Sequence, residues 1–216
     1  MTLVCVPLVA KTVEQMVAEM AAARARGADL VEIRLDHLAV FHPRRDLQLL
    51  LKNGPIPALI SISEPKWEGG EYEGDDSRRF NALCLAMELG AEYIDIELKV
   101  AGDFVRFISG KRPENFKLIV SSHNYQSTPS RDVLGSLVAR IQAVGADIVK
   151  IATTALDIVD VTHMFQIIVH CQYEWHVPII GLVMSERGAI SRLLCPKFGG
   201  YLTFATLDAG KESAAG

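Results

Sequence analysis

A single lysine interrupts an apolar segment of the chain, and it is the residue best suited to covalent chemistry. Lys150 lies in the run DIVKIAT at positions 147–153. Side chains alternate along a strand, so the Lys150 ammonium shares a face with Ile148 and Ala152. Burial disfavours the ammonium form, and the neutral amine that results attacks a carbonyl carbon to form a Schiff base. A structural lysine in a salt bridge, or one that reaches water from a strand end, is the alternative at this point.

Other segments alternate polar and aliphatic residues in the same way. The clearest are VEIRLD at 31–36, YIDIEL at 93–98 and FKLIVSSH at 116–123, which ends on His123. Each is followed by a helical stretch, which is typical of parallel strands covered by helices. The aliphatic faces then pack on helices, and the polar faces converge. Enclosed charges of both signs indicate a site.

This alternation of strand and helix continues along the whole chain. We expect eight strands, with helices between them, at 3–9, 30–36, 57–63, 93–98, 116–123, 148–153, 177–184 and 201–207. The order predicts an α/β fold, a (β/α)8 TIM barrel, rather than a doubly wound sheet. The sequence has neither a Gly-x-Gly-x-x-Gly turn nor a P-loop to support a dinucleotide fold. In a barrel, His123 and Lys150 are neighbours at the reactive rim, where a histidine beside an amine supplies a proton shuttle.

The end of the chain departs from a complete barrel. Only residues 208–216 follow the last expected strand, which is too few for an eighth helix. We therefore expect a single barrel domain over residues 1–216, C-terminally truncated and lacking the eighth helix. The outer apolar faces of the first and last strands would then need a partner or a further chain segment to cover them.

Composition argues against several classes of function. The chain has 216 residues, 50% of them hydrophobic, and a net charge of −4, so neither nucleic acid nor an anionic membrane is expected as a partner. No apolar stretch approaches the roughly 20 residues that span a bilayer. The first strand begins at Leu3, so we expect no signal or transit segment and a soluble intracellular protein.

The cysteines give no sign of disulfides or of a metal site. All four lie scattered in apolar contexts, which is typical of packed, reduced thiols: Cys5, Cys84, Cys171 and Cys195. His170, Cys171 and His176 are close enough in sequence to consider zinc, but no second ligand cluster accompanies them. We expect no bound metal.

Five motifs together resemble those of a known enzyme family. They are VEIRLD at 31–36, WEGG at 67–70, SSHNY at 121–125, DIVKIA at 147–152 and ISR at 190–192. Their order and spacing are similar to type I 3-dehydroquinate dehydratase over essentially the whole chain. KWEGG at 66–70 and FGGYLTF at 198–204 look most like the plant form, the dehydratase half of a bifunctional dehydratase and shikimate dehydrogenase. Nothing similar to the dehydrogenase half is present in this sequence.

The resemblance implies a lyase that works through a Schiff base. In the family, the lysine matched by Lys150 forms an imine with the C3 ketone of 3-dehydroquinate, and the protonated imine eases removal of the C2 proton. His123 matches the general base, which afterwards acts as the acid for loss of the C1 hydroxyl. Glu68 matches the carboxylate that orients this histidine. No cofactor is implied, because the imine supplies the electrophile.

The same resemblance assigns residues that bind the substrate. Glu32 and Arg34 match residues that hold its hydroxyls, and Arg192 matches the arginine that grips its carboxylate. Ser213 matches a serine on the closing loop. The implied product is 3-dehydroshikimate, and the implied setting is the shikimate pathway of aromatic amino acid biosynthesis.

Three features depart from the family pattern. Glu64 stands where the family has a substrate-binding arginine, and residues 61–64 look one position out of step with the usual third strand. Residues 173–176 look like an insertion in a loop away from the chemistry. The chain also ends at Gly216, before a glutamine that helps to close the lid. A divergent paralogue and a misplaced splice boundary would each explain these departures.

Two other functions therefore stay open. A catalytically impaired paralogue or fragment would keep the barrel without turnover. Another Schiff-base lyase of the class I aldolase type would share the strand lysine but not the SSHN and ISR motifs. A homodimer and a missing shikimate dehydrogenase domain also stay open as partners. A plant-derived chain would act in the plastid, although no transit peptide is recognisable.

Overall fold

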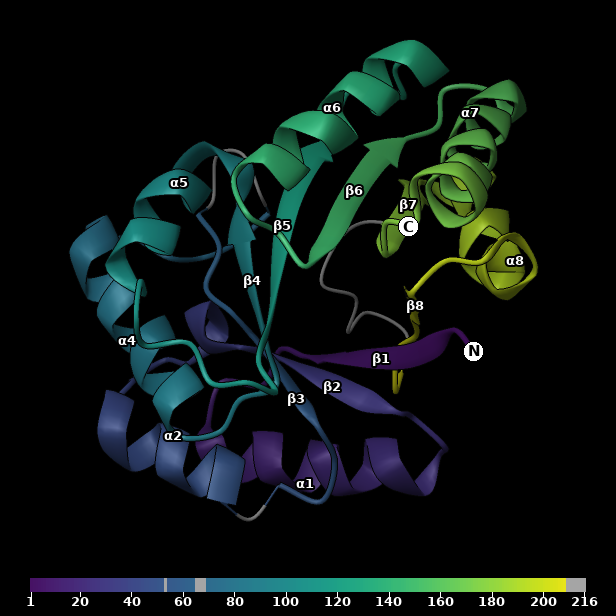
Figure 1. The fold of residues 1–216 in the computed structure, drawn as a ribbon. Helices are drawn as coiled ribbons and strands as arrows, with labels where there is room; N and C mark the ends of the chain where they lie inside the picture. Colours follow the sequence, from purple (N-terminus) through teal and green to yellow (C-terminus); the bar gives the residue numbers. More distant parts are fainter. Residues whose placement is uncertain (53, 65–68, 209–216) are drawn as a thin grey trace.

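Eight parallel strands form one sheet in the computed structural model, which describes residues 1–52, 54–64 and 69–208. The strands are β1 (Leu3–Leu8), β2 (Leu30–Arg34), β3 (Ala58–Ser61), β4 (Tyr93–Glu97), β5 (Lys117–Asn124), β6 (Ile148–Thr154), β7 (Ile179–Met184) and β8 (Leu202–Phe204). Their order in the sheet is β7-β6-β5-β4-β3-β2-β1-β8. The Tyr201 N–H donates to the Ile179 carbonyl at 2.7 Å and links the two ends of this order. The strands therefore curve into a nearly closed barrel, which confirms the predicted fold (Figure 1).

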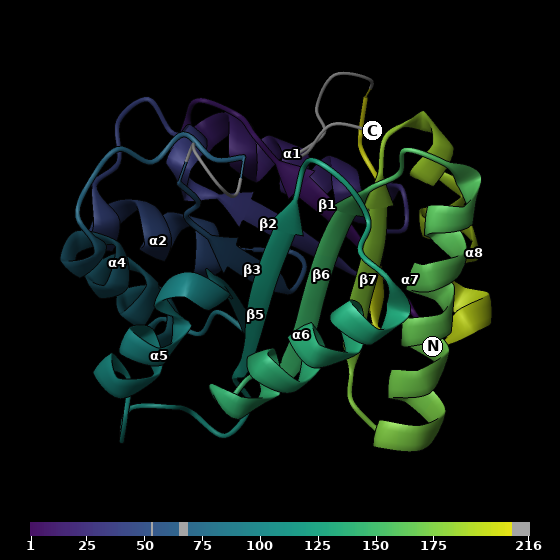
Figure 2. The same cartoon turned by 90° about the horizontal axis from the view of Figure 1, so that it is seen from above.

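Helices cover the outside of the barrel. They are α1 (Val13–Ala25), α2 (Pro43–Lys52), α4 (Asp76–Glu88), α5 (Leu98–Phe107), α6 (Arg131–Ala143), α7 (Ile158–His170) and α8 (Ile190–Phe198). The 3-10 turns η1 (Leu35–His37) and η3 (Glu186–Gly188) precede α2 and α8, and the π-helical turn η2 (Cys171–Trp175) extends α7. Figure 2 shows α6 and α7 on the outer side of β5, β6 and β7. Over the described ranges, every helix is too short or too polar to cross a membrane.

Strand alternation divides the apolar residues between two cores. Outward side chains such as Ile33, Ile94 and Val149 pack against the helices in the larger core. Inward side chains form a smaller core inside the barrel, whose members include Cys5, Leu30, Leu59, Ile119, Ile148 and Ile180. Most of these lie near the amino-terminal ends of their strands. Each large aliphatic side chain buried in this way contributes about 1.5–3 kcal/mol, so the inner core fixes the strands below the polar residues that follow.

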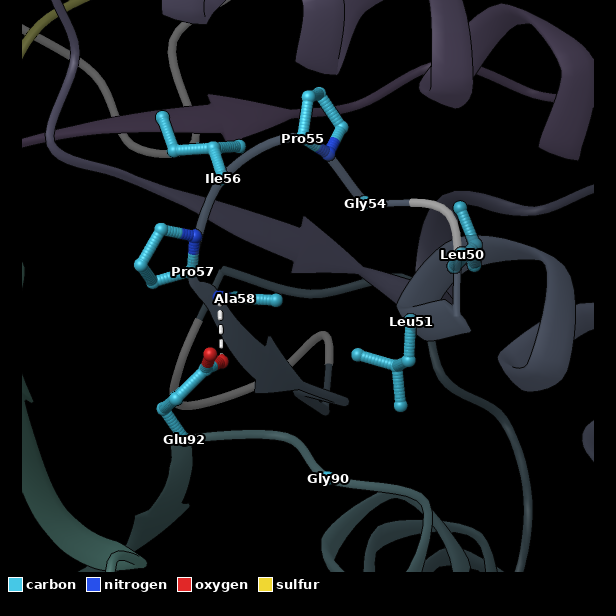
Figure 3. Close-up of a pocket in the computed structure, with 9 residues that line it drawn as sticks. All are labelled: Leu50, Leu51, Gly54, Pro55, Ile56, Pro57, Ala58, Gly90 and Glu92. Carbon is cyan, nitrogen blue, oxygen red and sulfur yellow. Dashed lines mark hydrogen bonds between the residues drawn. The ribbon is translucent and has the colours of Figure 1, made fainter.

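A three-residue motif repeats where helices lead into strands. Gly-Ala followed by an acidic residue occurs at 27–29, 90–92 and 145–147. The glycines have left-handed φ angles of 89°, 99° and 91°, which end the preceding helices. Each carboxylate accepts a hydrogen bond from a backbone N–H at the base of the neighbouring strand: Asp29 from Val4, Glu92 from Ala58 and Asp147 from Leu118. Figure 3 shows the Glu92 contact beside a pocket at the base of β3.

The amino-terminal end of the barrel is also closed by polar side chains. The hydroxyls of Tyr93 and Tyr201 lie 3.0 Å apart. Lys117 Nζ donates to the Tyr201 hydroxyl at 3.4 Å. Burial, with the Tyr201 hydrogen bond, raises the pKa of Tyr93 to about 12. This group joins β4, β5 and the residue before β8 at the floor of the barrel.

The predicted element boundaries were wrong mainly at strand ends. β3 ends at Ser61 and β8 at Phe204, which is earlier than expected. After β3, the carbonyls of Ser63 and Glu64 accept from the N–H groups of Tyr72 and Gly70 in the following loop and not from a neighbouring strand. A helix follows each of the first seven strands. Residues 205–208 contain no helix, and residues 209–216, where the eighth helix was expected to be missing, lie outside the described part of the chain.

Residues 173–176 are not the loop that the sequence suggested. The π-helical turn carries the helix through Trp175, and His176 ends it with a φ of 55°. A π-helical turn accommodates additional residues within a helix, which is the physical reason for the difference. The turn lies at the carboxyl end of α7, which leads to the base of β7, so the expected position away from the chemistry is consistent with the fold.

Candidate active site

The polar residues of five neighbouring strands, β2 to β6, meet inside the carboxyl-terminal half of the barrel. Register pairs Ser61 of β3 with Asp95 of β4, and Ser121 of β5 with Lys150 of β6. Their strand neighbours pack in the outer core, so alternation points these side chains inward. The inward polar residues of β2 to β6 are Glu32, Arg34, Ser61, Asp95, Glu97, Ser121, His123 and Lys150. The convergence predicted from the polar strand faces is therefore present.

Lys150 lies within this interior and is paired with a carboxylate. Its Nζ is 2.5 Å from Asp95 Oδ2, and the two side chains are only 8% and 6% exposed. The ring of Phe204 lies on another side, with its centroid 5.1 Å from Nζ. A cation over an aromatic face is stabilised by the ring quadrupole. Lys150 is therefore held as an ammonium by contacts from β4 and β8.

The electrostatics of Lys150 correct the expectation that burial leaves a neutral amine. Burial is the largest single influence and lowers the pKa of Lys150, but the carboxylates of Asp95 and Glu32 together raise it well above its ordinary value. In the resting protein, the nucleophile is charged. Lys150 is therefore in a buried ion pair with Asp95, as the salt-bridge alternative required, because nearby carboxylates outweigh desolvation.

Glu32 offers a hydrogen-bond acceptor beside the lysine. Its Oε1 accepts from the Ser61 hydroxyl at 2.9 Å, and its side chain is buried. Within the described residues, Glu32 Oε2 and Asp95 Oδ1 have no hydrogen-bond partner. A buried carboxylate oxygen without a donor is costly, so two of them near one ammonium favour a ligand that brings hydroxyl groups.

Arg34 is fixed at the end of β2 by its neighbour Asp36. Two nitrogens of the guanidinium donate to the two Asp36 oxygens at 3.0 and 2.7 Å, and Nη2 also donates to the Gly69 carbonyl at 3.3 Å. These contacts with Asp36 hold the pKa of Arg34 above its ordinary value despite burial. Asp36 also accepts from the Glu71 N–H at 3.0 Å. Arg34 therefore joins the end of β2 to the chain that follows β3.

His123 lies where the sequence placed it relative to Lys150. It is half-buried near the end of β5, and register sets it opposite Ala152, two residues beyond the Ser121 and Lys150 pair. Its ring is stacked on Tyr125, with ring centroids 6.0 Å apart. The predicted neighbourhood of His123 and Lys150 on adjacent strands is confirmed, while the catalytic role of His123 stays a prediction.

Arg192 lies in the first turn of α8, the helix between β7 and β8. Its Nη1 donates to the Val183 carbonyl at 3.3 Å, and its own carbonyl accepts from the Thr203 hydroxyl at 3.0 Å. Burial lowers the pKa of this half-buried guanidinium, and no carboxylate in the described part of the chain counters that influence. With one guanidinium nitrogen donating to a backbone carbonyl, Arg192 keeps further donors for an anionic ligand.

The remaining residues named from the sequence fall near or beyond the described ranges. Glu68 and Ser213 lie outside them. Glu64 is the last residue before residues 65–68, and its carbonyl accepts from the Gly70 N–H at 3.1 Å. Ser61 points inward and Ile62 packs in the outer core. β3 ends at Ser61, so an inner Ser63 and an outer Glu64 are what continued alternation predicts, and the one-residue slip of the third strand stays a prediction.

Sequence reasoning left several site residues unassigned. Asp95, Ser61 and Phe204 contact Lys150 or Glu32, yet none was given a role. Their inward strand positions are the one signal in the sequence that would have selected them. The described residues contain no cluster of three or more His, Cys, Asp or Glu side chains that could hold a metal ion.

Comparison with known proteins relates this arrangement to one family. The family model described as type I 3-dehydroquinase matches residues 4–216. The chain is 59% identical over 215 residues to the chloroplastic bifunctional 3-dehydroquinate dehydratase/shikimate dehydrogenase of Arabidopsis thaliana, covering 100% of this chain and 35% of that protein. It is 34% identical to the 3-dehydroquinate dehydratase of Desulfotalea psychrophila, covering 99% of this chain and 91% of the relative.

A solved structure supports the same relation. The crystal structure of 3-dehydroquinate dehydratase from Geobacillus kaustophilus aligns with a TM-score of 0.87 at 25% identity, covering 97% of this chain and 84% of that one. The likeness thus includes both sequence and fold. This chain belongs to the type I 3-dehydroquinase family.

Proposed function

We propose that this chain dehydrates 3-dehydroquinate to 3-dehydroshikimate through a Schiff base on Lys150. The observation that carries the proposal is the enclosed Lys150 ammonium, surrounded by carboxylates inside the barrel of a type I 3-dehydroquinase. The Desulfotalea relative, which this chain matches over nearly its full length, bears the dehydratase name alone. Membership of this family favours the dehydratase over an aldolase-type lyase.

The chemistry requires an amine, a base and an electron sink. The Lys150 nitrogen attacks the C3 ketone, and loss of water leaves an iminium ion. His123 removes the C2 proton, and the electron pair moves toward the iminium nitrogen. His123 then gives a proton to the departing C1 hydroxyl, and hydrolysis of the imine releases the enone.

The substrate is polar and anionic, and the interior offers matching groups. Glu32 Oε2 accepts a hydrogen bond from a substrate hydroxyl, and Arg34 lies beside it at the end of β2. Arg192 grips the carboxylate. By the same resemblance, Glu68 orients His123 and Ser213 belongs to the closing loop; both residues lie outside the described ranges.

Steady-state turnover of 3-dehydroquinate, followed by the absorbance of the enone product, tests the proposal. We expect Lys150→Ala to abolish turnover. Lys99→Ala, an exposed lysine on α5, is the matched control and should leave turnover unchanged. Turnover that survives Lys150→Ala would contradict the proposal.

A catalytically impaired paralogue is the second candidate function. Glu64 favours it, because a glutamate in place of the family's arginine leaves the site without one charged donor for the substrate. A wild-type chain that binds 3-dehydroquinate without converting it would support this candidate over the active enzyme.

The setting of the chain is inferred from one relative. The Arabidopsis protein is chloroplastic and carries a shikimate dehydrogenase in the same chain, and our sequence spans 35% of its length. We therefore infer a plastid location and a dehydrogenase partner domain for the native product. An intact transcript that encodes neither a plastid transit peptide nor a shikimate dehydrogenase domain would contradict this inference. A homodimer stays a prediction, which light scattering of the purified chain would test.

A further inference from the structure

Asp95 is an ion-pair partner that reaches Lys150 from across the barrel. It lies on β4, two strands away from Lys150 on β6. One oxygen, Oδ2, contacts Nζ at 2.5 Å, and the other, Oδ1, has no hydrogen-bond partner among the described residues. Both side chains are more than nine-tenths buried. The carboxylate therefore has the amine nitrogen as its neighbour and an oxygen left to accept from a ligand.

The other buried carboxylates nearby have different neighbours. Asp36 is bound to Arg34 through two hydrogen bonds. Glu97 accepts from Arg79 Nη1 at 2.9 Å. Glu32 accepts from a serine hydroxyl, so it adds charge near Lys150 without a direct contact. Of the four, Asp95 is the carboxylate placed on the reacting nitrogen.

The remaining groups around Lys150 do not replace this contact. Arg34 of β2 lowers the pKa of Lys150 by its positive charge. Cys5 of β1 is fully buried, and burial and the nearby carboxylates raise its thiol pKa, so it stays neutral. Phe204 of β8 offers a ring face, and His123 of β5 lies beyond the lysine toward the rim. Asp95 is therefore the acceptor placed to receive the Lys150 proton.

We propose that Asp95 is a catalytic residue, which takes a proton from the Lys150 ammonium for attack and later balances the charge of the iminium ion. This inference rests on the proposed function. The ammonium and carboxylate become an amine and a carboxylic acid, and the amine adds to the ketone to form a carbinolamine. Asp95 then returns its proton to the carbinolamine hydroxyl, which leaves as water. Ammonium and ketone thus become iminium and water, with the total charge unchanged.

Reductive methylation tests the coupling of the two residues without the substrate. Formaldehyde with cyanoborohydride modifies the neutral amine, and peptide mass spectrometry reports the rate at Lys150 as a function of pH. In Asp95→Asn, burial prevails over the remaining carboxylate, so the Lys150 profile should move to lower pH by at least about one unit. Asp46→Asn, which changes a fully buried carboxylate of α2, should leave it in place. An unmoved profile in Asp95→Asn would overturn the proposal.

Kinetics with 3-dehydroquinate test the catalytic part. Asp95→Asn should lower kcat on the order of 10²-fold or more, the range for a group that transfers a proton in catalysis, and change KM much less. Asp95→Glu keeps the negative charge but moves the carboxylate oxygen. Its kcat should therefore fall, while methylation of Lys150 should still begin at the same high pH as in the wild type. This second variant serves equally if Asp95→Asn does not fold. Wild-type kcat in either variant would overturn the proposal.

The two experiments separate the inference from the function on which it rests. A wild-type protein without dehydratase activity, whose Lys150 profile still moves in Asp95→Asn, would contradict the proposed function and support the pairing of Asp95 with the lysine. A wild-type protein with dehydratase activity, whose Lys150 profile does not change in Asp95→Asn, would support the proposed function and contradict the role of Asp95.

Discussion

The two ends of the barrel interior are built by the same strands but differ in how their polar groups are satisfied. At the floor, the hydroxyls of Tyr93 and Tyr201 pair with each other, and Lys117 donates to the second. At the carboxyl end, Asp95 Oδ1 and Glu32 Oε2 have no partner within the described residues. The polar groups named at the floor satisfy one another, whereas these two carboxylate oxygens of the upper interior are available to accept from a ligand.

This difference between the two ends assigns the floor mainly to stability and the upper interior mainly to function. Polar groups that satisfy one another stabilise the folded state, while buried groups without partners reduce its stability and are retained where they bind or react. Substitutions at the upper end should therefore change activity more than folding. Substitutions at the floor should do the opposite.

The largest effect on activity short of losing Lys150 is expected at His123. His123→Ala should lower kcat by about 10² to 10⁴-fold, the range for loss of a general base, because no proton acceptor then faces the C2 proton. Imine formation should persist, since Lys150 and Asp95 remain. Steady-state kinetics and borohydride trapping measure the two steps. His42→Ala, at an exposed histidine, is the control, and an equal loss there would argue against a specific role.

Arg79 should affect stability more than activity, because its side chain and its ion pair with Glu97 are buried. The side chain is 1% exposed and donates to Glu97 at 2.9 Å and Asp76 at 2.7 Å. Removing one partner of a buried ion pair destabilises a protein by about 3–5 kcal/mol, so Arg79→Met should lower the free energy of unfolding by that amount. Arg78→Met, at the adjacent and 85% exposed arginine, should change it little. Urea denaturation measures the free energy of unfolding of both variants, and an equal loss in the two would contradict the prediction.

The third strand offers a test of register at the upper end. Ser63→Arg should raise kcat/KM by at least about tenfold, because alternation turns residue 63 inward and a guanidinium there supplies a charged donor. Glu64→Arg should have a smaller effect from the outer side. The two variants control for each other in steady-state kinetics. A larger gain from Glu64→Arg would place Glu64 at the substrate and show that the third strand is not out of step.

The smallest effect is expected at the floor. Tyr201→Phe removes one partner of the tyrosine pair and should cost about 0.5–1.5 kcal/mol of stability, with kcat unchanged. The pKa of Tyr93, raised to about 12 by burial and this hydrogen bond, should fall in the variant. A raised folded-state pKa stabilises below the unfolded value of about 10, and that contribution is lost as pH rises through the folded value. Ultraviolet titration checks the pKa, with the 68% exposed Tyr173→Phe as control. A loss of turnover in Tyr201→Phe would contradict the claim that the floor of the barrel contributes to stability and not to activity.

Much of this arrangement could be predicted from local sequence patterns. Alternation identified the inward faces of β2, β4 and β6, and the strand order made His123 and Lys150 neighbours, because adjacent parallel strands align their carboxyl ends. These features depend on periods of two residues and on connections short enough to keep consecutive strands side by side.

Contacts across the barrel could not be predicted in this way. Asp95 meets Lys150 from two strands away, and Phe204 meets it from the far end of the sheet order, so both contacts depend on the curvature of the closed barrel. The charge of Lys150 followed from those contacts and not from its burial. The π-helical turn at Cys171–Trp175 likewise depends on how α7 accommodates additional residues.

Trapping of the covalent intermediate tests the central claim most directly. The purified chain is incubated with 3-dehydroquinate and borohydride, digested, and mapped by mass spectrometry. We predict one reduced adduct, on the peptide that contains Lys150, which is absent in Lys150→Ala and retained in Lys99→Ala. An adduct on another lysine, or an equal adduct in Lys150→Ala, would contradict the account.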